Sequence, residues 1–374
     1  MANLVLYRKY RPQSFSEVVG QAHIVRTLKN AVAGNLISHA YLFCGPRGCG
    51  KTTLARILAK AVNCKNIKKA PDDKAGEPCN ACASCLEINQ GRSLDFLEID
   101  AASNRGIDEM RELREGARFA PTTLAYKVFV IDEAHQLTKD ASNALLKTLE
   151  EPPSHAIFIL ATTETSKMIS TIVSRCQRFD FLKLTHSQIL ACLADISKKE
   201  DTLIEEAALR VIASHSGGAL RDAESLLDRV FTFHAGKKEE ITAKAVQEIL
   251  GIVDIEILSR FADLLSQKKA SEAVEFLNAN LERGMDPQEF AKNILSYLRQ
   301  IIILKISPAM QETLAPGLTQ EQRETLGKQA ENTDMKLATR ALKSFMDAEQ
   351  QMRYADIVQL PLELAIIDTC IPNS

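Results

Sequence analysis

The sequence predicts an α/β protein in which a parallel sheet comes first and helices alone follow. Short apolar runs alternate with segments of helical periodicity up to about residue 180. A glycine-rich loop joins the first of these runs to a helix, and beyond residue 180 helical periodicity continues to the C-terminus. Alternation of this kind is typical of a parallel sheet covered by helices on both faces.

Composition indicates a soluble globular protein of two or three domains. The chain has 374 residues, of which 45% are hydrophobic and 25% charged, and its formal net charge is −2. A near-neutral total leaves nucleic-acid binding open, because a local basic surface can still exist. The N-terminus lacks the apolar core of a signal peptide, and no apolar run approaches the ~20 residues of a membrane span. We therefore expect a cytoplasmic protein whose nine cysteines are reduced or metal-bound.

Strands are expected at 40–44, 94–100, 127–132 and 156–161, because these runs are apolar and rich in β-branched or aromatic residues. The helices between them are predicted at 22–33, 53–62, 107–119 and from Lys139, capped by Thr138, to the Pro152–Pro153 pair. Ahead of them, residues 7–21 form a basic and aromatic N-terminal arm. Val18 and Val19 give this arm an apolar edge, which either packs on the core or contacts an adenine.

Three helices are predicted after Phe181, at about 185–196, 205–215 and 219–233. A polar linker at 234–240 and about five more amphipathic helices complete the chain. We place domain boundaries near residues 180 and 242, which gives domains at 1–180, 181–242 and 243–374.

The glycine-rich loop at 45–52 fits G-x-x-x-x-G-K-[ST], the phosphate-binding loop of nucleoside triphosphatases. Glycines let the backbone curl so that its N–H groups converge on a phosphate. Lys51 can reach the β- and γ-phosphates, and the Thr52 hydroxyl suits Mg²⁺. The predicted triphosphate ligands in this stretch are Gly45, Pro46, Arg47, Gly48, Cys49, Gly50, Lys51, Thr52 and Thr53.

Two acids follow the strand at 127–132. Asp132 at its carboxyl end is predicted to bind Mg²⁺, and Glu133 to polarise the attacking water. Thr163, after the next strand, either contacts the γ-phosphate or caps a turn. Arg175 and Arg221 are candidate phosphate-contacting arginines, although isolated arginines more often form surface ion pairs.

Four cysteines form a separate group: Cys64, Cys79, Cys82 and Cys85. The last three follow C-x₂-C-x₂-C, a spacing typical of metal sites. Four thiolates suit a structural, tetrahedral Zn²⁺, which would fold residues 64–85 as a cysteine knuckle. An iron–sulfur cluster can use similar spacing, but no fourth Cys-Pro follows here, and the remaining alternative is unliganded thiols.

Together these features resemble the γ/τ subunits of bacterial DNA polymerase III, the clamp-loader ATPases of the AAA+ group. The resemblance covers nearly all of the chain and is densest over the first 225 residues. It depends on the phosphate-binding loop, the four cysteines and the segments 10–12, 18–21, 39–43, 144–153, 160–163 and 174–176.

The resemblance implies a role for several residues. Thr163 corresponds to the sensor-1 residue, Arg221 to the sensor-2 arginine of a small helical lid, and Arg175 to an arginine that enters the ATP site of a neighbouring subunit. The arm would surround the adenine through Tyr7, Arg11, Pro12, Val18 and Val19. The last domain would be a helical collar that joins subunits.

The resemblance also implies ATP, Mg²⁺ and structural Zn²⁺ as cofactors and a five-membered ring with other loader subunits. ATP would favour a spiral that opens a ring-shaped sliding clamp and encloses primer–template DNA, within the nucleoid-associated replication machinery. We expect Arg105 to face the DNA backbone. The resemblance groups the chain with the polymerase nucleotidyltransferases, although it has no polymerase site. The chain ends at Ser374, as a short form or a shortened piece.

Two other functions share these motifs. One is a non-hydrolysing structural subunit of the same loader, which need not keep Lys51, Thr52, Asp132 and Glu133. The other is a DNA motor such as a branch-migration helicase, which needs neither the knuckle nor the collar. Fold alone does not separate them.

Overall fold

The structure, a computed structural model, describes residues 4–67, 71, 75–235, 239–311 and 318–371. Residues 236–238 of the predicted linker therefore lie outside the described residues. The chain forms two compact units, one of residues 1–192 and 216–225 and the other of residues 193–215 and 226–374. No helix in the described ranges is long and apolar enough to cross a membrane.

The first unit contains a five-stranded parallel sheet with the order β2-β3-β4-β1-β5. Its strands are β1 (Ala40–Cys44), β2 (Phe96–Asp100), β3 (Lys127–Asp132), β4 (Ala156–Thr162) and β5 (Gln177–Asp180). The sequence prediction of four strands was wrong, because β5 lacks an apolar run: only Phe179 is buried, and its neighbours are exposed. An edge strand paired only with β1 can carry such polar residues.

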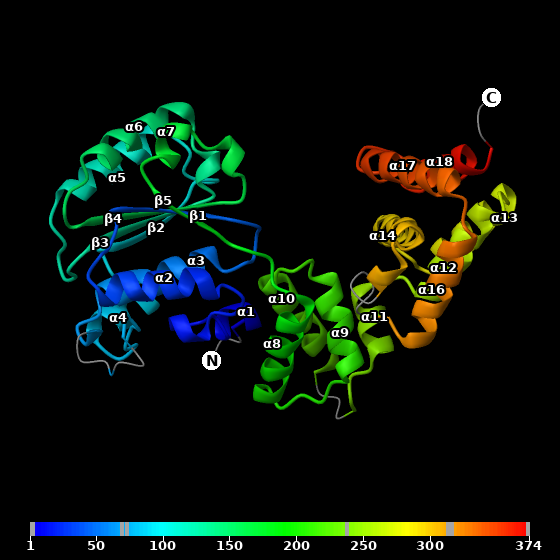
Figure 1. Cartoon of the computed structure of the whole chain (residues 1–374), viewed down its shortest axis with the longest axis horizontal. Helices are drawn as coiled ribbons and strands as arrows, with labels where there is room; N and C mark the ends of the chain where they lie inside the picture. Colours follow the sequence, from blue (N-terminus) through cyan, green and yellow to red (C-terminus); the bar gives the residue numbers. More distant parts are fainter. Residues whose placement is uncertain (1–3, 68–70, 72–74, 236–238, 312–317, 372–374) are drawn as a thin grey trace. The chain divides into compact units, whose positions relative to one another are not determined.

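Helices cover both faces of this sheet (Figure 1). One face packs against α2 (Ala22–Ala33) and α3 (Lys51–Val62), and the other against α5 (Ile107–Arg118), α6 (Lys139–Glu150) and α7 (Ser170–Val173). The predicted cap of α6 is confirmed, since the Ala141 N–H donates to the Thr138 hydroxyl at 3.2 Å.

Shorter elements complete the unit: α1 (Leu6–Lys9), η1 (Phe15–Glu17), α4 (Ala83–Asn89), η4 (Ala134–Gln136) and η5 (Thr165–Lys167). The arm thus contains one turn of helix, a short extended stretch and the 3₁₀ turn η1, whose Phe15 side chain is fully buried.

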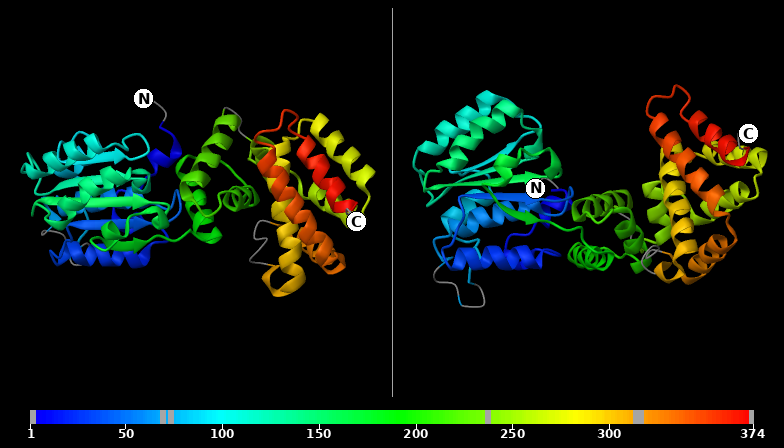
Figure 2. Two further views of the ribbon diagram at one scale, coloured as in Figure 1. Left: turned by 90° about the horizontal axis from the view of Figure 1, so that it is seen from above. Right: turned by 45° about the horizontal axis from the view of Figure 1, so that its top comes forward.

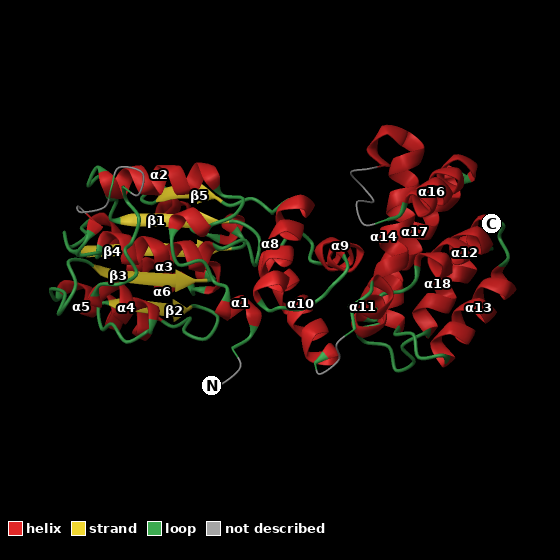
Figure 3. Cartoon of the chain, turned by 90° about the horizontal axis from the view of Figure 1, so that it is seen from below, coloured by secondary structure: helices red, strands yellow, loops and turns green. Residues whose placement is uncertain are grey.

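Helices α8 (His186–Lys199), α9 (Glu206–His215) and α10 (Leu220–His234) lie where the chain passes between the two units. Residues beyond 242 form α11 (Ala243–Leu250), α12 (Ile255–Ser266), α13 (Ala270–Glu282), α14 (Pro287–Ile306), η6 (Pro308–Met310), α16 (Gln320–Asn332), α17 (Met335–Gln351) and α18 (Leu360–Cys370). Figure 3 shows this part of the second unit as helices joined by loops.

The prediction of about five helices beyond residue 242 was too low, because the described residues there contain seven α-helices. In the sequence, helices α12 and α13 look like a single helix, because only residues 267–269 separate them. Lys268 ends α12 in a left-handed conformation (φ 57°) without a glycine or proline to mark the break.

The core of the second unit is aromatic at its centre. Phe261 contacts Phe290 and Phe345 edge-on, with ring centroids 5.0 and 5.8 Å apart. Helix α14 packs against α17, and α17 packs against α18 (Figure 2). This unit therefore has a hydrophobic core of its own.

Candidate active site and cysteine knuckle

A cavity of about 440 Å³ lies in the first unit, at the carboxyl ends of the strands. Its size is within the usual range for small-molecule sites, about 300–1,000 Å³. In a parallel sheet this edge is the expected ligand site. The cavity is lined by Tyr7, Arg11, Pro12, Val18, Val19, Arg47, Gly48, Cys49, Gly50, Lys51, Thr52, Thr53, Asp100, Ala102, Asp132, Glu133, Leu184, Leu220, Arg221 and Glu224.

The phosphate-binding loop has the backbone geometry that its glycines permit. Gly45, Gly48 and Gly50 have φ of 151°, 75° and 100°, and a Cβ at Gly45 would lie 2.6 Å from the Phe181 carbonyl oxygen. Helix α3 begins at Lys51, so its N-terminal N–H groups and positive dipole end meet the loop. Lys51 is 6% exposed, and its ammonium donates to the Gly45 and Pro46 carbonyls, both at 2.8 Å.

The predicted magnesium residues lie together. The Thr52 hydroxyl donates to Oδ2 of Asp132 at 2.7 Å, while Oδ1 of Asp132 accepts from the Glu133 N–H at 2.9 Å. Glu133 itself has φ of 48°, a left-handed conformation that is uncommon for a residue other than glycine. The two successive acids have different partners, since Asp132 accepts from Thr52 and Glu133 accepts from Thr163.

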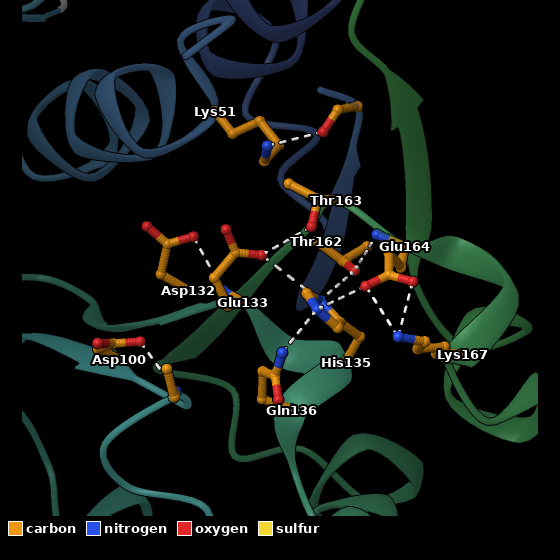
Figure 4. Close-up of polar contacts among 12 residues, drawn as sticks. Lys51, Asp100, Asp132, Glu133, His135, Gln136, Thr162, Thr163, Glu164 and Lys167 are labelled. Carbon is orange, nitrogen blue, oxygen red and sulfur yellow. Dashed lines mark hydrogen bonds and ion pairs between the residues drawn. The ribbon is translucent and has the colours of Figure 1, made fainter. Parts of the chain in front are cut away.

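Strand β4 lies between β1 and β3, so the residues at its end lie beside both the loop that follows β1 and the acids at the end of β3. The Thr163 hydroxyl donates to Oε2 of Glu133 at 3.0 Å (Figure 4). Sequence reasoning missed His135, whose side chain is 4% exposed and whose Nδ1 is 3.1 Å from the Thr162 hydroxyl oxygen and 3.4 Å from Oε2 of Glu133. The signal available in the sequence was the position of His135, two residues after Glu133.

The arm and α10 form the other wall of the cavity. The Arg221 guanidinium lies 4.7 Å from the centre of the Tyr7 ring, and it lowers the pKa of that phenol. Sequence reasoning also missed Glu224, which is 7% exposed on the same helix. Burial raises the pKa of Glu224 to about 7, against an opposing effect of the positive charge on Arg11. The sequence signal for Glu224 is that an acidic residue lies on the otherwise apolar face of a helix.

Two predicted arginines lie outside this cavity lining. Arg175 pairs with Glu150 at 2.7 Å and donates to the Thr171 carbonyl at 2.9 Å. Arg105 is exposed and follows the turn after β2, where its carbonyl accepts from the Thr138 N–H. Gly45 and Pro46 act through their carbonyls and do not line the cavity.

The four predicted cysteines form one cluster, in which all the Sγ atoms lie within 4.8 Å of one another. Thiolates around a tetrahedral zinc are about 3.8 Å apart, as the Zn–S bond of about 2.3 Å requires. The Cys79 N–H donates to Sγ of Cys64 and the Cys82 N–H to Sγ of Cys79, both at 3.3 Å. Burial opposes ionisation of Cys79, but N–H groups of Ala81 and Cys82 outweigh it and lower the pKa of this thiol to about 6.

A parallel sheet, a phosphate-binding loop after β1 and an acid pair at the carboxyl end of β3 define a P-loop nucleoside triphosphatase. Three family models match consecutive parts of the chain. They are the delta subunit of DNA polymerase III at residues 20–185, the ATPase lid domain of the DNA polymerase III clamp loader subunit at 188–236, and domain III of DNA polymerase III subunits gamma and tau at 241–373.

Relatives that match over nearly the whole of this chain agree with these models, although the chain spans only about two thirds or less of several of them. The chain is 33% identical to the gamma subunit of DNA polymerase III from Buchnera aphidicola over 363 residues, which are 97% of either chain. It is 42% identical over 374 residues to the tau subunit from Bacillus subtilis, which are 99% of this chain and 64% of that one. The chain belongs to the gamma/tau subunit family of the DNA polymerase III clamp loader.

Two further relations are more distant or partial. The chain matches 55% of the Escherichia coli tau subunit at 35% identity. Among solved structures, the RuvB Holliday junction branch migration motor of Thermotoga maritima aligns with a TM-score of 0.48 and 22% identity, over 68% of this chain and 79% of that one.

Proposed function

We propose that the chain binds ATP with Mg²⁺ and hydrolyses it as the motor subunit of a sliding-clamp loader. The observation that supports this best is the contact between Thr52 and Asp132, 2.7 Å long, beside the phosphate-binding loop. These are the two side chains that hold Mg²⁺ in P-loop triphosphatases, and Lys51 lies next to them.

Each remaining group has a role in this reaction. Lys51 and the loop N–H groups bind the β- and γ-phosphates, and Mg²⁺ neutralises charge that develops on them. Glu133 orients the attacking water, and Thr163 positions Glu133. On the opposite wall, Tyr7, Arg11, Pro12, Val18 and Val19 surround the base, and Arg221 contacts the phosphates.

The site is completed by another subunit. Arg175 is absent from the lining of this chain's own cavity, which supports a role in the ATP site of a neighbour. The last helix offers a surface for assembly, since the side chains of Leu360, Leu364 and Ile367 follow one face of α18 and are 43–52% exposed. We assign residues 1–180 to an ATPase domain, 181–242 to a lid and 243–374 to a collar that joins subunits in a five-membered ring.

The cysteine knuckle fits a structural Zn²⁺. The four Sγ atoms lie within 4.8 Å of one another, and all four ligands would come from the protein, which would leave no coordination position for a substrate. Cys64, Cys79, Cys82 and Cys85 would hold the ion. Its contribution would be to fold a segment that has no hydrophobic core of its own.

The proposal is tested by measuring ATP hydrolysis by the chain with its partner subunits, with and without a sliding clamp and primer–template DNA. We expect clamp and DNA together to stimulate hydrolysis, and Lys51→Ala to abolish both nucleotide binding and turnover. Lys198→Ala changes an exposed lysine on α8 and is the matched control. Arg105→Glu tests the proposed DNA contact, because it should reduce DNA stimulation in a salt-dependent manner.

Three results would count against the proposal. ATP turnover equal in Lys51→Ala and the parent chain would exclude this cavity as the active site. Nucleotide binding without turnover in the full assembly would favour a structural subunit. Strand displacement by the purified chain without any clamp would favour a translocating motor.

A further inference from the structure

Lys60 is a buried lysine on the phosphate-binding helix α3, and no role in ATP hydrolysis accounts for it. Its side chain is 1% exposed, and Nζ donates to the carbonyl oxygen of Gln13 at 2.7 Å, to Oε1 of Gln13 at 3.0 Å and to Oδ1 of Asn80 at 2.8 Å. An ammonium has three donors, so all of its hydrogen-bonding capacity is used. Burying an ammonium without hydrogen-bond partners costs free energy. Any movement of Gln13 or Asn80 away from Lys60 is therefore unfavourable, and the two residues are held close to each other.

The two partners of Lys60 belong to different parts of the chain. Gln13 is a residue of the N-terminal arm and follows Pro12, which lines the nucleotide cavity. Asn80 is a residue of the cysteine knuckle, between Cys79 and Cys82, and its own amide donates to the Gln13 carbonyl at 3.0 Å. Arm, knuckle and phosphate-binding helix therefore meet at one buried cation.

A second contact joins the same two segments. Glu77 of the knuckle is 9% exposed, and its Oε2 accepts from the Phe15 N–H of the arm at 2.7 Å. Its other oxygen is 3.0 Å from the ammonium of Lys29 on α2. Gly76 fits closely at this place, since a Cβ there would lie 2.5 Å from the Lys29 carbonyl oxygen. The knuckle thus contacts the arm at residues 13 and 15, between Pro12 and Val18 of the cavity wall.

We propose that the cysteine knuckle, when it holds its metal ion, fixes the N-terminal arm against helix α3 through Lys60, Asn80 and Glu77, so that metal occupancy sets the affinity for nucleotide. The inference deepens the proposed function, because it concerns the same nucleotide site. Lys60 is a positioning residue, since it acts through Gln13 and touches no cavity residue in its own hydrogen bonds.

The physical argument is one of conformational entropy. Asn80 and Glu77 hold their positions only if residues 75–85 are folded, and that segment depends on its four cysteines for a fixed structure. Without the metal, the arm loses two anchors and must be ordered by the nucleotide itself, which weakens binding. Linkage is reciprocal, so bound nucleotide should also raise the affinity for the metal.

The test uses the full chain in its zinc-loaded, chelator-stripped and zinc-restored forms, with zinc content measured in each. The probe is a fluorescent ADP analogue with Mg²⁺, titrated to equilibrium. We expect zinc removal to raise the dissociation constant about 10-fold and zinc restoration to reverse the change. Amide hydrogen exchange without nucleotide should become faster in residues 10–19 on zinc removal.

Variants separate the proposed link from the metal site. Lys60→Met removes the donors at similar length and should weaken nucleotide binding about 10-fold with zinc still bound. Lys65→Met, at an exposed position of the knuckle, is the matched control. Asn80→Gly suits the positive φ of 51° but lacks the side chain, whereas Asn80→Asp keeps an oxygen for Lys60 and should bind nucleotide more tightly than Asn80→Gly.

We expect these variants to raise the KM for ATP. Because they leave the catalytic groups untouched, kcat at saturating ATP should stay within about 2-fold of the parent value. If Lys60→Met fails to fold, Asn80→Gly carries the same test, with circular dichroism as the check. Equal nucleotide affinity with and without zinc, or in Asn80→Gly and the parent chain, would overturn the inference alone. Absence of nucleotide binding by the zinc-loaded parent chain would instead overturn the proposed function.

Discussion

The hydroxyl of Thr163 donates to the carboxylate of Glu133 at 3.0 Å, across thirty residues of sequence. The contact arises because β4 pairs in parallel with β3, which places the residue after β4 beside the acids at the end of β3. One carboxylate oxygen of Glu133, Oε2, is therefore held by a neutral donor, the hydroxyl of Thr163. A carboxylate held in this way is free to accept a proton or orient a water with its other oxygen.

We expect Glu133→Gln to bind ATP within about 3-fold of the parent chain but to hydrolyse it about 10²–10⁴-fold more slowly, because the amide cannot act as a base. Thr163→Val should also slow turnover, by a smaller factor, and Thr163→Ser should restore it. Equilibrium nucleotide binding and single-turnover hydrolysis in the assembled loader measure the two effects. Glu151→Gln, at an exposed position after α6, is the control. Hydrolysis at the parent rate in Glu133→Gln would exclude Glu133 as the base.

Arg175→Ala should leave nucleotide binding by the isolated chain unchanged, because Arg175 is not part of its own cavity lining. In the assembled loader we expect hydrolysis to fall about 10³-fold or more, as for arginines supplied in trans to other triphosphatases. Glu150→Gln removes the ionic partner of Arg175 without removing the arginine, and should retain activity. Weakened binding by the isolated Arg175→Ala chain would contradict a role in trans.

The sequence predicted the parts of this protein whose signal is local. The phosphate-binding loop, strands β1 and β3 and the helix after Thr138 each follow from a short pattern of residue types. Strand β5 did not, because its stability comes from pairing with β1 and not from its own side chains. Likewise, the environment of His135 depends on strand order, and that of Glu224 depends on residues of the arm that are more than two hundred positions away.

Asp95→Ala should destabilise the first unit by about 3–5 kcal/mol, because it leaves buried donors without an acceptor. Asp95 is fully buried, and its carboxylate accepts from the N–H groups of Thr122, Thr123 and Leu124 at 2.7–3.0 Å. Denaturant unfolding followed by hydrogen exchange in β2 and β3 measures the change. Asp108→Asn is the control, since Asp108 is largely exposed and its ion pair should contribute little.

Asp95 also predicts a pH dependence. Burial alone would raise the pKa of Asp95, but the three N–H donors outweigh it and hold this pKa below its ordinary value of 3.8. The stabilising contribution is therefore complete above pH 3.8 and is lost as the pH falls through the lower pKa of the folded state. Acid unfolding of Asp95→Asn should be less steep than that of the parent chain, and equal slopes would contradict the assignment.

Glu224→Gln should stabilise the nucleotide-free chain at about pH 8 and change it little at about pH 4, where the carboxyl is protonated in both states. The pKa of Glu224 is raised from 4.5 to about 7 in the folded protein, so its contribution is complete below 4.5 and is lost as the pH rises toward 7. The difference of about 2.5 pKa units, which already includes the opposing effect of Arg11, corresponds to about 3 kcal/mol. Urea unfolding of both chains between about pH 4 and pH 8 measures it, with Asp222→Asn, an exposed neighbour on α10, as the control. If the free energies of unfolding of the two chains differed by the same amount at every pH in this range, Glu224 would keep one protonation state. That result would contradict the raised pKa of Glu224.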